Sequence, residues 1–171
     1  MQRELILLRH AKSAWPIGVR DRDRPLTARG QANATRAGEV LAAGKRLPDL
    51  ILASPAERTT LTAQLVSAAM PSVPVGFEES IYDASWWEVL DVVRALDAAH
   101  SLVVLIGHNP AMEDLSSELA GRHSNPEALK RLRTKFPTCA MATLLSDESW
   151  PLWGTDGCQL THFWTPREDD E

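Results

Sequence analysis

Three short apolar runs stand out along the chain, each bounded by charged or turn-forming residues. They lie within residues 4–8, 49–53 and 101–106. Unbroken apolar runs of this length are typical of strands that are buried on both faces of a sheet. Further strand candidates lie at residues 73–77, 139–145 and 159–164.

Signals for the start of a helix follow the first two runs. Thr27 is a good N-cap, and the Ala-rich segment behind it predicts a helix to about Leu47. Ser54 and Glu57 have the spacing of a capping box, which predicts the start of a second helix. Pro55 fits the first helical position between them.

The second half of the chain has three more helix starts. Ser85 and Glu88 repeat the capping-box pattern ahead of apolar residues at helical spacing. Asn109 is the predicted N-cap of a helix through Leu119, and Asn125 that of a shorter one. Strands therefore alternate with helices, which predicts an α/β fold with a mostly parallel sheet and crossover helices.

Composition and charge narrow the classes of protein. The 171 residues, 44% hydrophobic and 24% charged, suit one globular domain over residues 1–171. A formal charge of −5 argues against a partner that is nucleic acid or an anionic membrane. The first apolar run is too short for a signal peptide or a membrane span, so we expect a cytoplasmic protein. We expect Cys139 and Cys158 to be buried and reduced, and residues 167–171 to form a frayed acidic end.

Candidate chemistry lies where the three apolar runs end. Arg9 and His10 follow the first run, and His108 follows the third. Arg58 lies in the first turn of the helix after the second run. Because the carboxyl ends of parallel strands meet at one edge of a sheet, we expect a compact cationic pocket there. Phosphoryl transfer needs such a pocket, and a histidine can act as its nucleophile.

Each of these residues alone also has a structural explanation. An Arg-His pair can end a strand at the surface without any role in chemistry. The guanidinium of Arg58 can equally form an ion pair with a nearby carboxylate, because the positive end of a helix dipole offers it nothing. In the loop after the first run, Arg20 is placed to add positive potential to an anion site.

Four motifs in order strengthen the functional interpretation. They are Leu-Leu-Arg9-His10, Pro25-Leu26-Thr27-x-x-Gly30, Ser54-Pro55-x-x-Arg58-Thr59-x-x-Thr62-Ala63 and Gly107-His108-Asn109-Pro110. Together they resemble the histidine phosphatase superfamily, and the Gly-His-Asn-Pro form is most similar to its SixA-type phosphohistidine phosphatase branch. The resemblance implies a phosphoglycerate mutase-like fold: a three-layer α/β sandwich whose mostly parallel central sheet carries helices on both faces.

The resemblance also implies roles for the site residues. His10 would be the nucleophile that becomes phosphorylated, and no metal or cofactor would be needed. The residues expected to bind the phosphoryl group and stabilise its transition state are Arg9, Arg58 and His108, with Asn109 and Arg20 as further phosphate-binding candidates.

Two positions depart from the pattern of the family. Ala11 stands where the family usually has glycine after the Arg-His pair. The second departure concerns the general acid. Larger members of the family place a glutamate shortly before a tyrosine. That pattern suggests Glu79 ahead of Tyr82, with Asp83 as the alternative. A phosphohistidine leaving group is a nitrogen that is readily protonated, so it tolerates a weakly defined acid better than a phosphate ester does.

These features predict a metal-independent phosphatase that acts on phosphohistidine in a signalling or phosphotransfer protein. The alternatives are a phosphatase for a small phosphate ester and a non-catalytic module that binds phosphorylated ligands. Residues 15–24 and 78–87 are expected to border the pocket and to set substrate choice. An open mouth favours a protein substrate, whereas Trp15 or Trp86 as a roof favours a small molecule.

Overall fold

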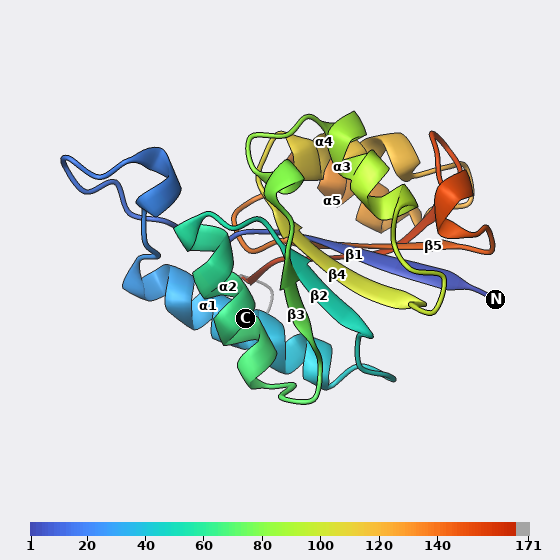
Figure 1. Cartoon of the computed structure of the whole chain (residues 1–171). Coiled ribbons are helices and arrows are strands. Elements are labelled where there is room, and N and C mark those ends of the chain that lie inside the picture. Colours follow the sequence, from blue (N-terminus) through green and yellow to red (C-terminus); the bar gives the residue numbers. More distant parts are fainter. Residues whose placement is uncertain (167–171) are drawn as a thin grey trace.

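The computed structural model describes residues 1–166, which form one six-stranded sheet between two layers of helices (Figure 1). The strands are β1 (Arg3–Arg9), β2 (Leu50–Ala53), β3 (Val75–Phe77), β4 (Leu102–Gly107), β5 (Met141–Ser146) and β6 (Gln159–Trp164). Their order across the sheet is β3-β2-β4-β1-β5-β6. The strands β3, β2, β4 and β1 run parallel to one another, and β5 runs antiparallel to both of its neighbours, β1 and β6, so the sheet is mostly parallel as predicted.

Helices cover both faces of this sheet. They are α1 (Ala28–Ala42), α2 (Glu57–Ala68), α3 (Trp86–Arg94), α4 (Ala111–Leu119) and α5 (Pro126–Thr134), and short 3₁₀ turns lie at η1 (Asp21–Asp23), η2 (Glu79–Ile81) and η3 (Trp150–Leu152). Figure 1 shows α1 and α2 below the sheet and α3, α4 and α5 above it. The predicted three-layer α/β sandwich is thus confirmed.

Burial on both faces of the sheet explains why the sequence of β1 is apolar throughout instead of alternating. Leu5 and Leu7 pack into the core under α3, α4 and α5, whereas Ile6 and Leu8 pack into the core against α1 and α2. Successive side chains of a strand point to opposite faces, so a strand covered on both sides needs apolar residues throughout.

Three of the predicted helix caps are confirmed. The Thr27 hydroxyl accepts a hydrogen bond from the Gly30 amide at 3.0 Å, and the Asn125 side chain accepts one from the Ala128 amide at 3.0 Å. Ser85 begins α3 with the predicted capping box.

Two helix starts and one helix end differ from the prediction. The helix α2 begins at Glu57 with Ala56 as N-cap, so the capping box headed by Ser54 and the placement of Pro55 at the first helical position are both wrong. The Ser54 hydroxyl instead lies 2.8 Å from His108 Nε2. The helix α4 begins after Pro110, and Asn109 instead accepts a hydrogen bond from the Glu113 amide one turn into it. The helix α1 ends at Ala42, because the residues up to the exposed Leu47 offer it no buried face.

Both cysteines are buried with free thiols, as expected. Among residues 1–166 no helix is long and apolar enough to cross a membrane. The predicted frayed end at residues 167–171 lies outside the described residues.

The close approach of α1 to the chain after β1 requires a glycine. A Cβ at position 30 would stand 2.1 Å from the carbonyl oxygen of Lys12, which also accepts the Thr27 amide at 2.9 Å. The start of α1 is therefore packed directly against the segment that follows His10.

We predict that Gly30→Ala lowers the free energy of unfolding by about 1–3 kcal/mol, because the added methyl group must push backbone away. Urea denaturation measures the change. The matched control is Gly76→Ala, where the nearest atom to a new Cβ is a Leu52 methyl group at an ordinary 3.5 Å. Equal stability of the two variants would contradict the prediction.

Candidate active site

The carboxyl ends of β1 and β4 bring the two predicted histidines together. Arg9 pairs with Gly107 in the parallel register, and the His10 amide donates to the Gly107 carbonyl at 3.0 Å. The rings of His10 and His108 consequently lie with their centroids 5.4 Å apart. The sequence prediction that these strand ends converge is confirmed.

The ring of His10 is held in one tautomer. Its side chain is buried, and Nδ1 lies 2.8 Å from the Ala11 carbonyl oxygen. A carbonyl only accepts hydrogen bonds, so Nδ1 carries the proton and Nε2 keeps its lone pair. Burial, with the nearby charges of Arg58 and Arg9, lowers the pKa of His10 to about 3. The imidazole is therefore neutral near pH 7, as a nucleophile must be.

A buried hydroxyl ties this nucleophile candidate to α2. Thr62 is fully buried, and its hydroxyl accepts the Ala11 amide at 3.1 Å while donating to the Arg58 carbonyl at 2.7 Å. Ala11, which replaces the usual glycine, fits here with no exposed surface. The threonine of the third motif thus fixes the backbone on both sides of the site.

Arg58 reaches the site from the first turn of α2 and is held by a loop residue. Its Nη1 donates to the Asp21 carbonyl oxygen at 2.7 Å, and its Nη2 donates to Asp21 Oδ2 at 3.2 Å. The ion pair that the sequence left open as an alternative is therefore present. Because a guanidinium carries five N–H groups, donors remain for a phosphoryl group.

His108 is positioned by Ser54 and Tyr82. The Ser54 hydroxyl is fully buried and lies 2.8 Å from His108 Nε2. The rings of Tyr82 and His108 meet edge to face at 5.7 Å between centroids. Burial and the charge of Arg58 lower the pKa of His108 to about 4, so this ring is also neutral near pH 7.

Arg9 and Asn109 donate hydrogen bonds to the same backbone carbonyl. Arg9 Nη1 donates to the Phe136 carbonyl at 2.9 Å, and Asn109 Nδ2 donates to the same oxygen at 3.2 Å. Burial lowers the pKa of Arg9 without threatening its charge, since Glu113 offsets part of the effect. Within residues 1–166, Arg9 Nε is buried without a hydrogen-bond partner. For Asn109, phosphate binding stays a prediction, because its amide is engaged with Phe136 and Glu113.

The other predicted site residues lie at the surface. Arg20 is 82% exposed and donates to Asp23 at 2.7 Å, so it faces a carboxylate rather than the histidines. Glu79 pairs through both oxygens with Arg22, with 2.8 Å between Oε2 and Nη2. The hydrogen bonds from Arg22 lower the pKa of Glu79, which works against a proton donor. Asp83 is exposed as well.

Sequence reasoning missed Asp21 and Arg24. Asp21 accepts from Tyr82 at 2.8 Å as well as from Arg58, and Arg24 Nε donates to its second oxygen at 3.2 Å. In the sequence they belong to a run of alternating charges, and only the spacing of three between Asp21 and Arg24 hinted at a pair. In the sequence, Tyr82 only helped to locate Glu79 as the candidate acid.

The two tryptophans named as possible roofs do not form one. Trp15 is 75% exposed, and the guanidinium of Arg24 stacks 3.5 Å from the centre of its ring. Trp86 is partly buried and packs on the core under α3. Its neighbour Trp87 is 58% exposed.

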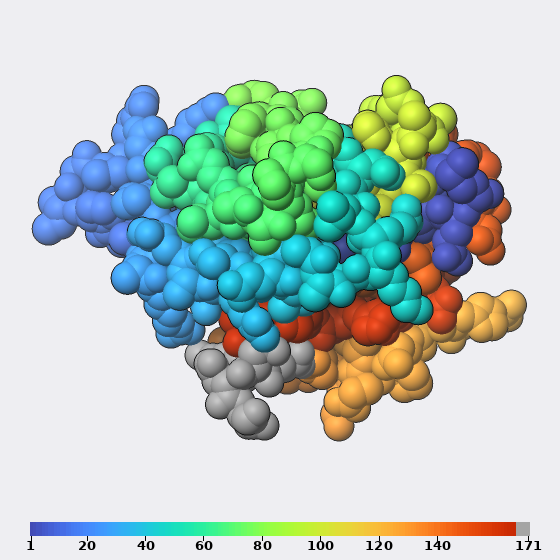
Figure 2. Space-filling view, turned by 90° about the horizontal axis from the view of Figure 1, so that it is seen from below, coloured from blue at the N-terminus to red at the C-terminus, as the bar shows by residue number. Residues whose placement is uncertain are grey.

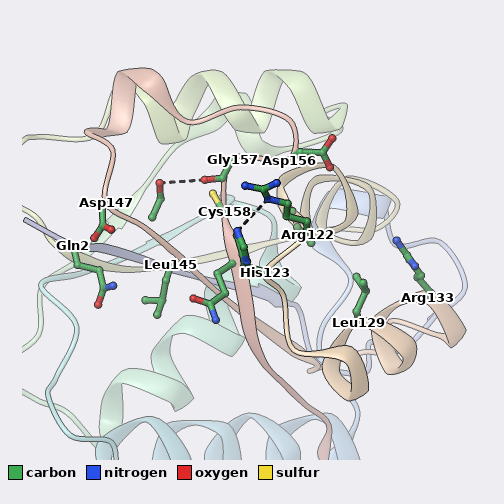
Figure 3. Close-up of a pocket in the computed structure, with 14 residues that line it drawn as sticks. Gln2, Arg122, His123, Leu129, Arg133, Leu145, Asp147, Asp156, Gly157 and Cys158 are labelled. Atoms are coloured by element: carbon green, nitrogen blue, oxygen red, sulfur yellow. Dashed lines mark hydrogen bonds between the residues drawn. The ribbon is translucent and has the colours of Figure 1, made fainter.

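A separate hollow of about 810 Å³ lies at the other end of the sheet, beside the start of β1 (Figure 3). Arg122 and Arg133 line it together with Asp147 and Asp156. Charges of both signs face this hollow, and none of the predicted site residues lines it. The geometry for phosphoryl chemistry lies at the carboxyl ends of the strands.

Comparison with known proteins agrees with this geometry. The family model of the histidine phosphatase superfamily (branch 1) matches residues 5–95. An uncharacterised protein of Mycobacterium leprae is 31% identical over 94% of this chain and all of its own length. Two structures of candidate SixA phosphohistidine phosphatases are also similar. That from Nakamurella multipartitia has 29% identity and a TM-score of 0.85 over 97% of both chains.

The second structure, from Agrobacterium tumefaciens, has 32% identity and a TM-score of 0.80 over 96% of this chain and 98% of its own. A phosphoglycerate mutase from Plasmodium falciparum shares the fold, with a TM-score of 0.60 and 14% identity over 96% of this chain and 89% of its own. The expected phosphoglycerate mutase-like fold is thereby confirmed. The chain belongs to the histidine phosphatase superfamily and is a histidine phosphatase.

Proposed function

We propose that this phosphatase removes phosphoryl groups from phosphohistidine in a protein, through a covalent intermediate on His10. The observation that carries the proposal is the contact between His10 Nδ1 and the Ala11 carbonyl, which leaves Nε2 as the nitrogen with a lone pair. That nitrogen belongs to a neutral ring among cationic side chains, which is the arrangement that nucleophilic attack on a phosphoryl group requires.

The reaction follows from these contacts in two steps. His10 Nε2 attacks phosphorus while the bond from phosphorus to the substrate nitrogen breaks, and the leaving imidazole takes its proton from water. Arg9 and Arg58 balance the charge on the phosphoryl oxygens. A water molecule then attacks phosphorus and gives a proton to the hydroxide left by the first step, the bond to Nε2 breaks, and inorganic phosphate leaves with His10 neutral again.

The surroundings of the site support a protein substrate. Trp15 is turned outward, and Figures 1 and 2 show the segment before α1 projecting from the body of the molecule. Glu79, the predicted acid, is held by Arg22, and a nitrogen leaving group needs an acid less than an oxygen does. The two similar structures, at 29% and 32% identity, are named as candidate phosphohistidine phosphatases, which supports the same substrate class. A small phosphate ester remains the alternative substrate class.

We predict that His10→Ala lowers kcat/KM on a phosphohistidine peptide by about 10³-fold or more, because it removes the nucleophile. The assay measures release of inorganic phosphate from the peptide and, in parallel, from an aryl phosphate. His123→Ala is the matched control, since that histidine is exposed near the other end of the sheet.

Each outcome of this assay separates the candidate functions. Turnover of the peptide that requires His10 supports the proposal. Turnover of the aryl ester alone moves the substrate to small esters. If phosphate binds while neither substrate is turned over, the chain is a binding module and the proposal fails.

We predict that kcat/KM for an aryl phosphate has no enzyme-dependent acid limb near pH 6.5. The pKa values of His10 and His108, about 3 and about 4, lie below the ordinary value of 6.5. Both rings therefore stay neutral as the pH falls, and activity is lost only when they protonate below about pH 4. The ionisation of the substrate is measured separately by phosphorus NMR and divided out. A limb with a midpoint near 6.5 would show that one of the rings titrates normally.

We predict that Glu79→Gln leaves turnover of the phosphohistidine peptide within about threefold of the unmodified protein, because the nitrogen leaving group needs little acid catalysis. Glu78→Gln is the control, as that neighbour caps η2 through Ser80. A loss of about 10²-fold or more for Glu79→Gln alone would instead identify Glu79 as the acid.

A further inference from the structure

The Asp21 carboxylate is held by three side chains beside the candidate site. Oδ2 accepts from the Tyr82 hydroxyl at 2.8 Å and from Arg58 Nη2 at 3.2 Å. Oδ1 lies 3.2 Å from both Nε and Nη2 of Arg24. Two guanidinium groups and a hydroxyl are also the kind of donors that bind a phosphate.

Both arginines are buried, so their charges are poorly screened by water. Arg58 and Arg24 are each about 6% exposed, whereas the Asp21 side chain is about half exposed. The hydrogen bond from Tyr82 and the charge of Arg58 hold the pKa of Asp21 below its ordinary value. The carboxylate is therefore ionised near pH 7 and offsets one of the positive charges that would attract a phosphoryl group.

The position of Arg58 links this carboxylate to the chemistry. Tyr82, which donates to Asp21, has its ring 5.7 Å from that of His108. The His108 ring lies 5.4 Å from that of His10. The charge of Arg58 also lowers the pKa of both histidines. The two terminal nitrogens of Arg58 each have one hydrogen bond to Asp21. A phosphoryl group bound at His10 by Arg58 would therefore share that guanidinium with Asp21.

We propose that Asp21 is an internal anion that competes with phosphate for Arg58 and so limits how tightly the site holds inorganic phosphate. A phosphatase releases phosphate in every cycle, and a site with several uncompensated arginines would retain this product. The carboxylate weakens that retention while its backbone carbonyl keeps Arg58 in place. The benefit of this role, faster release of the product, rests on the proposed function. The effect of Asp21 on phosphate binding does not depend on turnover.

The test compares the binding of inorganic phosphate to the unmodified protein and to Asp21→Asn by isothermal titration calorimetry. We expect Asp21→Asn to bind phosphate about tenfold more tightly, because a negative charge near the bound anion is removed. Asp23→Asn is the matched control: it makes the same change in charge within the same turn, but Asp23 pairs with the exposed Arg20. The control should bind phosphate as the unmodified protein does.

A second pair of variants locates the effect on Arg58. In Arg58→Gln the further change Asp21→Asn should alter phosphate binding much less than it does in the unmodified protein, as a double-mutant cycle measures. Asp21→Ala, which keeps the backbone carbonyl, should change affinity in the same direction as Asp21→Asn. Thermal unfolding of each variant checks that it is folded.

Several results would overturn the inference. Weaker binding by Asp21→Asn would mean that the carboxylate only positions Arg58. Equal binding by the Asp21 and Asp23 variants would mean that Asp21 does not act on the site, and so would an absence of phosphate binding in all proteins. Tighter binding in a protein that hydrolyses neither test substrate would keep this inference and refute the proposed function.

Discussion

The site depends on the parallel register of three neighbouring strands. Arg9 lies opposite Gly107 across the pair of β1 and β4, and Ala53 lies opposite Ile106 across the pair of β2 and β4. The chain therefore leaves the sheet at one level in three places. The backbone thus places His10, Ser54 and His108 at the same edge of the sheet.

Burial at that edge gives the two histidines their chemical state. His10 is buried and His108 is half-buried, and the charges of Arg58 and Arg9 act on both rings, so the neutral form is favoured in each. Two neutral histidines can thus lie among positive charges here, whereas a free histidine, with its ordinary pKa of about 6.5, is partly protonated near neutral pH. The contact of His10 Nδ1 with the Ala11 carbonyl leaves the lone pair of that ring on Nε2.

The core of this arrangement could be predicted from the sequence because it lies on regular elements. An apolar run marks a buried strand, and a residue just behind the run must lie at the strand end, which located Arg9, His10 and His108. Ser54 was misassigned because its hydroxyl suits either a helix cap or a ring nitrogen, and only the neighbouring strand decides between them. Asp21 was missed because nothing periodic distinguishes it from Asp23 in a run of alternating charges.

The loop between β1 and α1 is fastened at its base and free at its tip. Arg24 is fixed by Ser13 and Asp21, whereas Ile17 at the tip is fully exposed. Length and composition can therefore change across the tip during evolution without disturbing the residues that carry out the chemistry. A family of such enzymes can acquire new partners by altering a few surface residues, while the catalytic apparatus is inherited unchanged.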